Sequence, residues 1–320
     1  MLCRICESEG PHATHMAREM MFGLRDEFPY FQCRLCGCLQ ITEYPPNLER
    51  YYPLRDYYSF ASVETDRSFR RFLSRQRDAY LLLGGSILGK AVAAFGSDSL
   101  LQNIGCSGLT THSRVLDVGC GSGGLLNRLY HVGFRNLVGA DPYLAECRSI
   151  AGVTLLRASM EDLRDEFDLI MLNHSLEHMR FQQQQACHVA RLLAPNGTAM
   201  IRVPIVSSYA WKTYGVNWVQ LDAPRHLYLH SIPSLKLIVA RAGMRVTRIG
   251  FDSTYFQFTG SEMIQRGTAL REATEADWAS FGAGELRKFA RLASALNSTG
   301  AGDQVVLWLA KAQTTAAPNA

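Results

Sequence analysis

From residue 114 onward, short apolar runs alternate with segments in which apolar residues recur at helical spacing. Five runs, RVLDVG, NLVGAD, VTLLRAS, FDLIMLN and TAMIRVP, precede a helical stretch at 231–242 and two more runs, MRVTRIGFD and QVVLWLAKA. Such runs are typical of strands buried on both faces, and their alternation with helices builds a parallel sheet. The pattern predicts an α/β fold over residues 111–312: a seven-stranded Rossmann-like sheet with helices on both faces. We expect helices after the first and fourth strands and shorter helical segments after the second and third.

The residues before 111 lack this alternation. Residues 43–110 hold a tyrosine-rich connector, EYPPNLERYYPLRDYYSF, and a helical stretch from about Asp66 to Leu83, where five arginines lie among the apolar positions: Arg67, Arg70, Arg71, Arg75 and Arg77. Two interpretations are open, a solvated basic face or a lid helix whose guanidinium groups meet a phosphate. The polar tail at 313–320 predicts disorder.

Charge and hydropathy narrow the class of protein. The net charge of +4 and the pI of about 8.6 permit an acidic small substrate and do not indicate the strong positive field of a nucleic-acid-binding protein. The start, MLCRICESEG, has no long apolar core, and Lys90 and several glycines interrupt the longest apolar stretch before the ~20 residues that span a bilayer. We therefore expect a cytoplasmic protein without a membrane span, whose nine cysteines are thiols or metal ligands.

Four cysteines form two C-x-x-C pairs near the N-terminus. Cys3 and Cys6 make the first pair, Cys33 and Cys36 make the second, and 26 residues separate the pairs. Two tight turns that each present two thiolates can close a tetrahedral site of the structural kind. The spacing predicts a zinc ribbon over residues 1–42 that holds a structural Zn²⁺. Buried thiols without a metal are the alternative, and the candidate substitute ligands are His12, His15 and Cys38.

The stretch RVLDVGCGSGGLL raises the question of a nucleotide cofactor. Its glycines at 119, 121 and 124 satisfy G-x-G-x-x-G, the dinucleotide fingerprint, but Asp117 stands two residues before the first of them in an apolar strand. A nicotinamide cofactor brings an anionic pyrophosphate to this turn, whereas a carboxylate suits a cationic ligand. S-adenosylmethionine carries an ammonium and a sulfonium, so the residues favour it. The alternative is that Asp117 only caps the turn.

Three further segments support this interpretation. Asp141 ends the second strand, where its oxygens could accept both ribose hydroxyls, and taken alone it fits either cofactor. The segments ASMEDL, FDLIMLNHSLEHM and LAPNGTAMIRVP follow in order. As a set, residues 114–204 resemble class I S-adenosylmethionine-dependent methyltransferases, with ASMEDL as the turn that lines the adenine.

The resemblance implies a set of cofactor-binding residues. The methionine pocket would be shaped by Asp117, Gly119, Cys120, Gly121 and Gly123. The ribose would meet Asp141 and Pro142, the adenine would be flanked by Ser159, Met160 and Glu161, and Asn173 and His174 would lie beneath the cofactor.

A second motif overlaps this region. HSLEH, at 174–178, reads as H-x-x-E-H, the pattern of inverted zinc proteases. That chemistry needs a helix that places both histidines on one face. Here the motif begins at the end of a buried strand, so we interpret it as the loop after the fourth strand.

The stretch IVSSYAWKTYGVNWVQLDAPRHLYLHS lies where such enzymes keep their acceptor residues. It offers flat aromatic surfaces and, as polar groups, Arg225 and the candidate catalytic residues His226 and His230. His226 is the better candidate for the base, because His230 adjoins the Ser-Pro start of the next helix and can serve to fix it. The alternative is a structural flap whose aromatic side chains pack on the sheet.

The whole layout resembles bacterial methyltransferases of polysaccharide and deoxysugar pathways. This resemblance implies methyl transfer to a small molecule, a hydroxyl of a sugar, nucleotide-sugar or glycan. Larger sugar C-methyltransferases carry a further C-terminal domain, so O-methylation is the narrower hypothesis. A nucleic-acid methyltransferase that docks through the zinc ribbon is one alternative, although the chain has no strong basic run and has NHSL where N-P-P-Y would stand. A non-catalytic interaction protein is the other.

Overall fold

The chain folds around one mixed sheet. The computed structural model describes residues 1–52, 69–96, 98–150 and 152–312, so the tail at 313–320 and Arg67 lie outside the described residues. The sheet has eight strands in the order β11-β12-β9-β8-β4-β5-β7-β6. Five strands run parallel: β4 (Arg114–Val118), β5 (Asn136–Ala140), β7 (Val153–Leu156), β8 (Phe167–Asn173) and β9 (Leu193–Pro204). The antiparallel strands are β6 (Arg148–Ile150), β11 (Met244–Phe251) and β12 (Gln304–Lys311).

This architecture confirms the predicted α/β class and all seven predicted strands. The eighth strand, β6, is an addition. The shorter helical segments expected after the second and third strands are wrong, because β5 leads through a turn into β6 and β7 is followed by a turn at 160–162. Both segments are short and rich in polar residues, so they have no apolar face that would fix a helix on the sheet.

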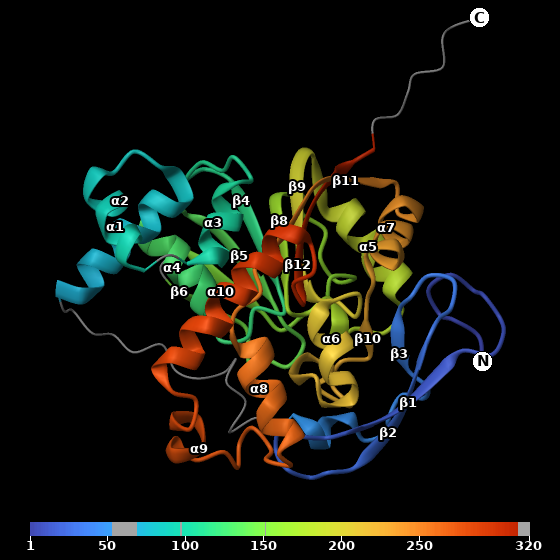
Figure 1. Ribbon diagram of the computed structural model, residues 1–320. Coiled ribbons are helices and arrows are strands. Elements are labelled where there is room, and N and C mark those ends of the chain that lie inside the picture. The colour runs from blue at the N-terminus through green and yellow to red at the C-terminus, as the bar shows by residue number, and fades with distance from the viewer. Residues whose placement is uncertain (53–68, 97, 151, 313–320) are drawn as a thin grey trace, which may run out of the picture.

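Helices cover both faces of the sheet, as the alternation of side chains along each strand requires. Leu169 and Met171 of β8 pack with the helices α1 (Phe69–Leu83), α3 (Ser99–Gly105) and α4 (Gly124–Val132). Ile170 and Leu172 belong to the opposite cluster, which holds α5 (Gln182–Leu192), α7 (Ile232–Arg241) and the N-terminal strands. Figure 1 shows α1 to α4 on one side of the sheet and α5 and α7 on the other.

The remaining helices lie after α1 and around the later part of the chain. They are α2 (Ile87–Phe95), α6 (Tyr209–Tyr214), α8 (Phe256–Gln265), α9 (Glu275–Ala279) and α10 (Ala283–Thr299), with short 3₁₀ turns at Leu48–Tyr51, Leu176–His178, Gly215–Asn217 and Val219–Leu221. In the part of the chain that is described, no single helix has both the length and the hydropathy of a membrane span. The segments Phe72–Leu83 and Ile87–Phe95 have the length and hydropathy of a membrane span only when they are taken together, and a bend of 104° separates them.

Helix α1 is attached to α4 by charge. Asp78 accepts hydrogen bonds from Arg77 and, on α4, from Arg128. Arg70 and Arg75 are exposed. Of the arginines predicted on this helix, Arg77 therefore pairs with its neighbour Asp78, and Arg70 and Arg75 face solvent.

The N-terminal segment forms a second, four-stranded sheet in the order β1-β2-β3-β10. Its own strands are β1 (Ala13–Arg18), β2 (Glu27–Gln32) and β3 (Leu39–Ile41), while β10 (Tyr228–Leu229) comes from the later part of the chain. Figure 1 shows this blue segment beside β10. The division of the chain at residue 42 stays a prediction.

Candidate functional site

The loop that joins β4 to α4 has a backbone that only glycine adopts readily. Gly119, Gly121 and Gly123 have φ values of 76°, 51° and 81°. A Cβ at Gly119 would lie 2.7 Å from the Cβ of Ser175, whereas a Cβ at Gly124 would meet open space. The constrained glycines are therefore at 119, 121 and 123. The third glycine of the dinucleotide fingerprint is not among them.

Asp117 lies in the centre of the sheet just before this loop. Its residue is 4 % exposed, and among the described residues no donor makes a hydrogen bond to its carboxylate. Burial, together with the nearby charge of Asp141, raises the pKa of the Asp117 carboxyl to about 7. A buried carboxylate without a donor is costly unless a ligand supplies one. This site fits a cationic group such as the ammonium of S-adenosylmethionine.

Asp141, at the end of β5, supports the glycine loop. One carboxylate oxygen accepts the N–H of Gly121 at 3.0 Å and the other accepts the N–H of Tyr143 at 2.9 Å. Each oxygen keeps further lone-pair capacity for a ribose hydroxyl. Beside it Pro142 is exposed, and the half-buried Cys120 packs against Gly139, where a Cβ would lie 2.6 Å from its sulfur.

The turn after β7 holds the three predicted adenine contacts. Met160 is 2 % exposed, Glu161 is exposed, and Ser159 donates both its N–H and its hydroxyl to Asp162 at 2.9 and 2.8 Å. These hydrogen bonds lower the pKa of Asp162. The S-x-x-D spacing is the available sequence signal for this side-chain turn.

The loop after β8 borders the glycine loop. Asn173 accepts a hydrogen bond from Arg202 on β9 at 3.0 Å, and Arg202 in turn binds Asp252 at 2.8 Å. His174 has a φ of 51°, which turns the chain sharply at the strand end. Because the next residue, Ser175, contacts Gly119, this loop lies between the cofactor residues and the pocket described next.

A pocket of about 430 Å³ opens beside this loop. Its lining includes His174 and His178 from the β8 loop, and Asp222 and His226 from the segment before β10. The sequence did not indicate His178 or Asp222 as site residues. The HSLEH motif forms a strand end and a 3₁₀ turn at Leu176–His178, not the helix that a zinc protease needs.

One buried carboxylate organises the histidines of this pocket. Glu177 is fully buried. Its Oε1 lies 3.2 Å from Nδ1 of His174 and 3.9 Å from Nε2 of His226. Burial would raise the pKa of Glu177, but the hydrogen bond from His174 and the other two histidine rings nearby outweigh it and hold the pKa at about 2. The pocket therefore has a fixed negative charge beside the ring nitrogen of His226.

The hydrogen bonds of His226 define which nitrogen faces the carboxylates. Its Nδ1 lies 2.7 Å from the carbonyl oxygen of Gln220, which can only accept, so Nδ1 carries a proton and Nε2 is the nitrogen that faces the carboxylates. Nε2 lies 3.7 Å from Asp222. The neighbouring ring of His178 is 4.7 Å away, and burial together with the charge of His226 lowers the pKa of His178 to about 4. His178 is therefore neutral near pH 7.

His230 lies apart from the pocket lining. It is fully buried, its Nδ1 lies 3.0 Å from the hydroxyl of Ser234 and its Nε2 lies 2.9 Å from the side-chain oxygen of Gln182. Burial lowers the pKa of His230 to about 4. The structure thus brings His226 into the pocket and places His230 beneath the start of α7. The aromatic stretch also contributes to the core, because Trp211 and Trp218 are buried.

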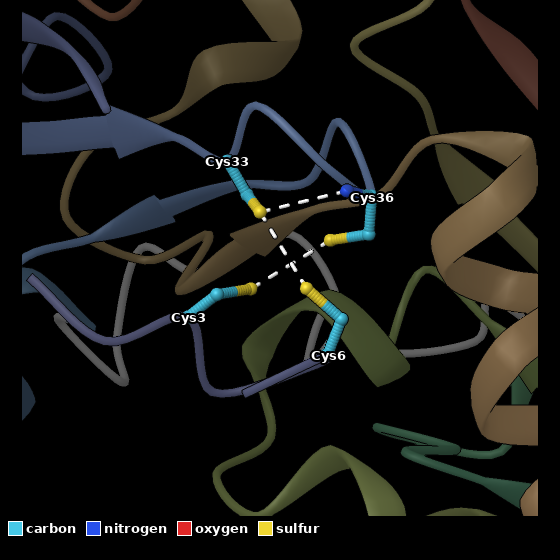
Figure 2. Close-up of side chains that lie close together, drawn as sticks. All are labelled: Cys3, Cys6, Cys33 and Cys36. Atoms are coloured by element: carbon cyan, nitrogen blue, oxygen red, sulfur yellow. Dashed lines mark hydrogen bonds between the residues drawn. The ribbon is translucent and has the colours of Figure 1, made fainter. Parts of the chain in front are cut away.

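The four predicted metal ligands converge at the N-terminus (Figure 2). The sulfurs of Cys3 and Cys36 are 3.6 Å apart, as are those of Cys6 and Cys33, and all four lie within 4.8 Å of one another. Four sulfurs at ~2.3 Å from one Zn²⁺ would be about 3.8 Å apart. The donor set therefore fits a tetrahedral Zn²⁺.

Neighbouring groups favour the thiolate form of Cys3, whereas the hydrogen bond to Cys3 and burial raise the pKa of Cys36. The hydrogen bond from Cys36 lowers the pKa of Cys3 to about 4, and Gln40 donates to the Cys3 sulfur at 3.1 Å. Cys38, a candidate substitute ligand, lies 4.0 Å from Nδ1 of His230, while His12 stacks on Phe31. Neither belongs to the cluster of four, and nor does His15, which packs against Trp211.

Comparison with known proteins identifies the domain. A family model described as a methyltransferase domain matches residues 88–249. A curated tRNA U34 carboxymethyltransferase of Methylococcus capsulatus is 28 % identical over 148 residues, which make up 42 % of this chain and 46 % of that protein. The chain thus spans less than half the length of this curated relative.

Two solved structures were also matched over much of the chain. The mycolic acid cyclopropane synthase CmaA1, in complex with SAH and CTAB, is 19 % identical with a TM-score of 0.46, and the match covers 70 % of this chain and 85 % of that chain. The cyclopropane synthase MmaA2 of Mycobacterium tuberculosis is 16 % identical with a TM-score of 0.44, and the match covers 77 % and 100 %.

Proposed function

Because the chain belongs to the methyltransferase domain family, we propose that it transfers a methyl group from S-adenosylmethionine to a hydroxyl group of a small acceptor. The observation that carries the proposal is the buried carboxylate of Asp117, which has no donor among the described residues and stands beside three glycines with positive φ. An ammonium group satisfies this carboxylate, whereas a pyrophosphate would be repelled by it.

The cofactor half of the site is assigned residue by residue. Asp117 and the loop of Gly119, Cys120, Gly121 and Gly123 hold the methionine part, and Asp141 and Pro142 lie at the ribose. The adenine meets Ser159, Met160 and Glu161, and Asn173 and His174 lie beneath the cofactor. When bound, S-adenosylmethionine supplies an electrophilic methyl group.

The acceptor half is assigned to the pocket that His226 lines. With its ring neutral and Nδ1 donating to Gln220, Nε2 of His226 takes the proton of the acceptor hydroxyl as that oxygen attacks. The imidazolium that forms lies 3.9 Å from the ionised Glu177, so the fixed charge stabilises it. His230, with both ring nitrogens engaged, acts on the position of this segment rather than on the proton.

The acceptor class rests on the pocket and on the resemblance to polysaccharide-pathway enzymes. A pocket of about 430 Å³ is in the usual range for a small ligand, and its three histidines and the carboxylate of Asp222 can hydrogen-bond several hydroxyl groups. A hydroxyl of a sugar, nucleotide-sugar or glycan fits this lining. The curated relative is named for action on tRNA, so transfer to tRNA is the second candidate.

We also propose that Cys3, Cys6, Cys33 and Cys36 bind one structural Zn²⁺. The support is the sulfur spacing of 3.6 Å in two crossed pairs. Four thiolates close such a site without an open position, so the metal would hold the two turns together and take no part in methyl transfer.

An acceptor panel tests the proposed function. Protein is incubated with methyl-labelled S-adenosylmethionine and with nucleotide-sugars, oligosaccharides or tRNA, and Asp117→Asn is the matched control in each reaction. We expect label in the sugar acceptors with the wild type and a large loss with the variant. Label in tRNA alone would replace the proposed acceptor, and label in none of these acceptors would contradict the proposal.

A further inference from the structure

The segment 226–231 begins with His226 and ends at the start of α7, and each of its six residues contacts the N-terminal strands or the cysteine turns. Tyr30 on β2 donates its hydroxyl hydrogen to the carbonyl oxygen of His226 at 2.8 Å. Ile41 donates its N–H to the carbonyl oxygen of Leu227 at 3.0 Å. The first two residues of the segment are therefore held through their backbone.

The next four residues continue this contact. β10 pairs with β3, with Tyr228 opposite Gln40 and Leu229 opposite Leu39. His230 lies 4.0 Å from the sulfur of Cys38, and Ser231 donates its hydroxyl to the carbonyl oxygen of the metal-ligand candidate Cys36. The segment is thus part of the N-terminal sheet, although it lies almost 190 residues further along the chain.

We propose that the four-cysteine module, residues 1–42, is part of the methyl-transfer site, and that Tyr30 is a positioning residue that holds His226 at the pocket. The proposal rests on the proposed function, because it assigns a role toward the residue that takes the proton. The module then acts on the acceptor half of the site.

The link from the cysteines to His226 is short. Gln40 donates to the sulfur of Cys3 at 3.1 Å, and Gln40 is also the β3 residue opposite Tyr228. β3 and β10 have only three and two residues, so few ladder hydrogen bonds join them, and the contacts of the second cysteine turn with His230 and Ser231 add to their attachment. A metal-ordered module of about 40 residues has a core too small to fold well alone.

The glycine loop is held by other groups. The N–H of Gly119 donates to the carbonyl oxygen of Ala140 at 2.8 Å, and the N–H of Gly121 donates to Asp141. Both acceptors belong to the end of β5. Loosening the module is therefore expected to displace His226 and to leave the cofactor residues in place.

A pair of tyrosine variants tests the positioning role. Tyr30→Phe removes only the hydroxyl that binds the carbonyl oxygen of His226, while Tyr51→Phe removes another tyrosine hydroxyl, which donates to Asp26 at 2.7 Å. We expect Tyr30→Phe to lower kcat about tenfold, with the Kd of S-adenosylmethionine and the metal content within twofold of the wild type. Tyr51→Phe should leave all three within twofold. Equal kcat values in the two variants would overturn the assignment of Tyr30.

Hydrogen exchange tests the same link without an acceptor. The backbone amides of residues 226–231 are compared in the wild type before and after removal of metal by a chelator, and in Cys33→Ser. We expect at least tenfold faster exchange in this segment and unchanged exchange at 114–126. Unchanged exchange at 226–231 would overturn the proposal. If the wild type methylates none of the acceptors offered, the proposed function fails, and this exchange measurement still decides whether the module holds the segment.

Discussion

The cofactor half and the acceptor half of the candidate site are assembled in different ways. The cofactor half comes from residues 117–174, where successive parallel strands end at one edge of the sheet. The acceptor half combines the loop after β8, the segment around His226 and the N-terminal module. The first half depends on local sequence and strand order. The second depends on contacts between residues as far apart as Tyr30 and His226.

The largest expected effect is a loss of kcat on substitution of His226, which belongs to the acceptor half alone. His226→Ala should lower kcat by about 10² to 10⁴, because the group that takes the acceptor proton is lost, and leave the Kd of S-adenosylmethionine unchanged. Steady-state kinetics at saturating cofactor and acceptor, with calorimetry for the cofactor, check this.

His230→Ala is the matched control for that prediction. It removes a buried ring whose two nitrogens are engaged by Ser234 and Gln182, so we expect a lower melting temperature and a kcat closer to the wild type. Equal losses of kcat in both variants, at equal stability, would show that the pocket does not distinguish the two histidines.

Asp117 tests the cofactor half alone. Asp117→Ala should weaken binding of S-adenosylmethionine by about 2 kcal/mol or more, roughly a thirtyfold rise in Kd, because a charge-assisted hydrogen bond is lost. The melting temperature should not fall, since the variant also removes a buried carboxylate without a donor. A calorimetric Kd within threefold of the wild type would contradict the assignment of Asp117.

The pKa of Asp117 predicts a smaller, pH-dependent effect. Burial and the charge of Asp141 raise this pKa to about 7, so below pH 7 the free protein holds the carboxyl in its neutral form. A bound ammonium favours the charged form, and binding must then release a proton. The Kd of S-adenosylmethionine should rise about fivefold from pH 7 to pH 6.

Asp117→Asn is the control for the pH effect, because its side chain does not titrate. Its Kd should be flat over the same range. An equal pH dependence in the variant would assign the titrating group to another residue.

The smallest expected effect distinguishes the two adjacent glycines. Gly124→Ala should change stability by less than about 1 kcal/mol, in the stabilising direction, because the residue is helical and a Cβ there meets open space. Gly123→Ala places a Cβ 2.9 Å from Leu155 at a φ of 81° and should be clearly destabilising. Thermal unfolding of both variants measures the contrast.

The difference between the cofactor half and the acceptor half also explains what could be predicted from the sequence. The strands of the main sheet are continuous apolar runs, and the strand ends place Asp117, Asp141 and Asn173 at one edge, so the fold class followed from local pattern. β6 could not be predicted, because its three residues are too few to carry a periodic signal. The spacing of the cysteines predicted their cluster for the same local reason.

The acceptor pocket could not be predicted in this way. Glu177 was visible only as part of a misleading H-x-x-E-H motif, and its effect depends on the burial of its carboxylate among three histidines. The different roles of His226 and His230 depend on the hydrogen-bond partners of their ring nitrogens. Such partners come from tertiary packing, which single-sequence patterns do not encode.

Equilibrium titration of the wild type with S-adenosylmethionine and, separately, with NAD tests the central claim most directly. The account predicts that S-adenosylmethionine binds at one site per chain and that NAD neither binds tightly nor competes, because Asp117 takes a cation and only Gly119, Gly121 and Gly123 are constrained. Tight binding of NAD, with no measurable binding of S-adenosylmethionine, would contradict it.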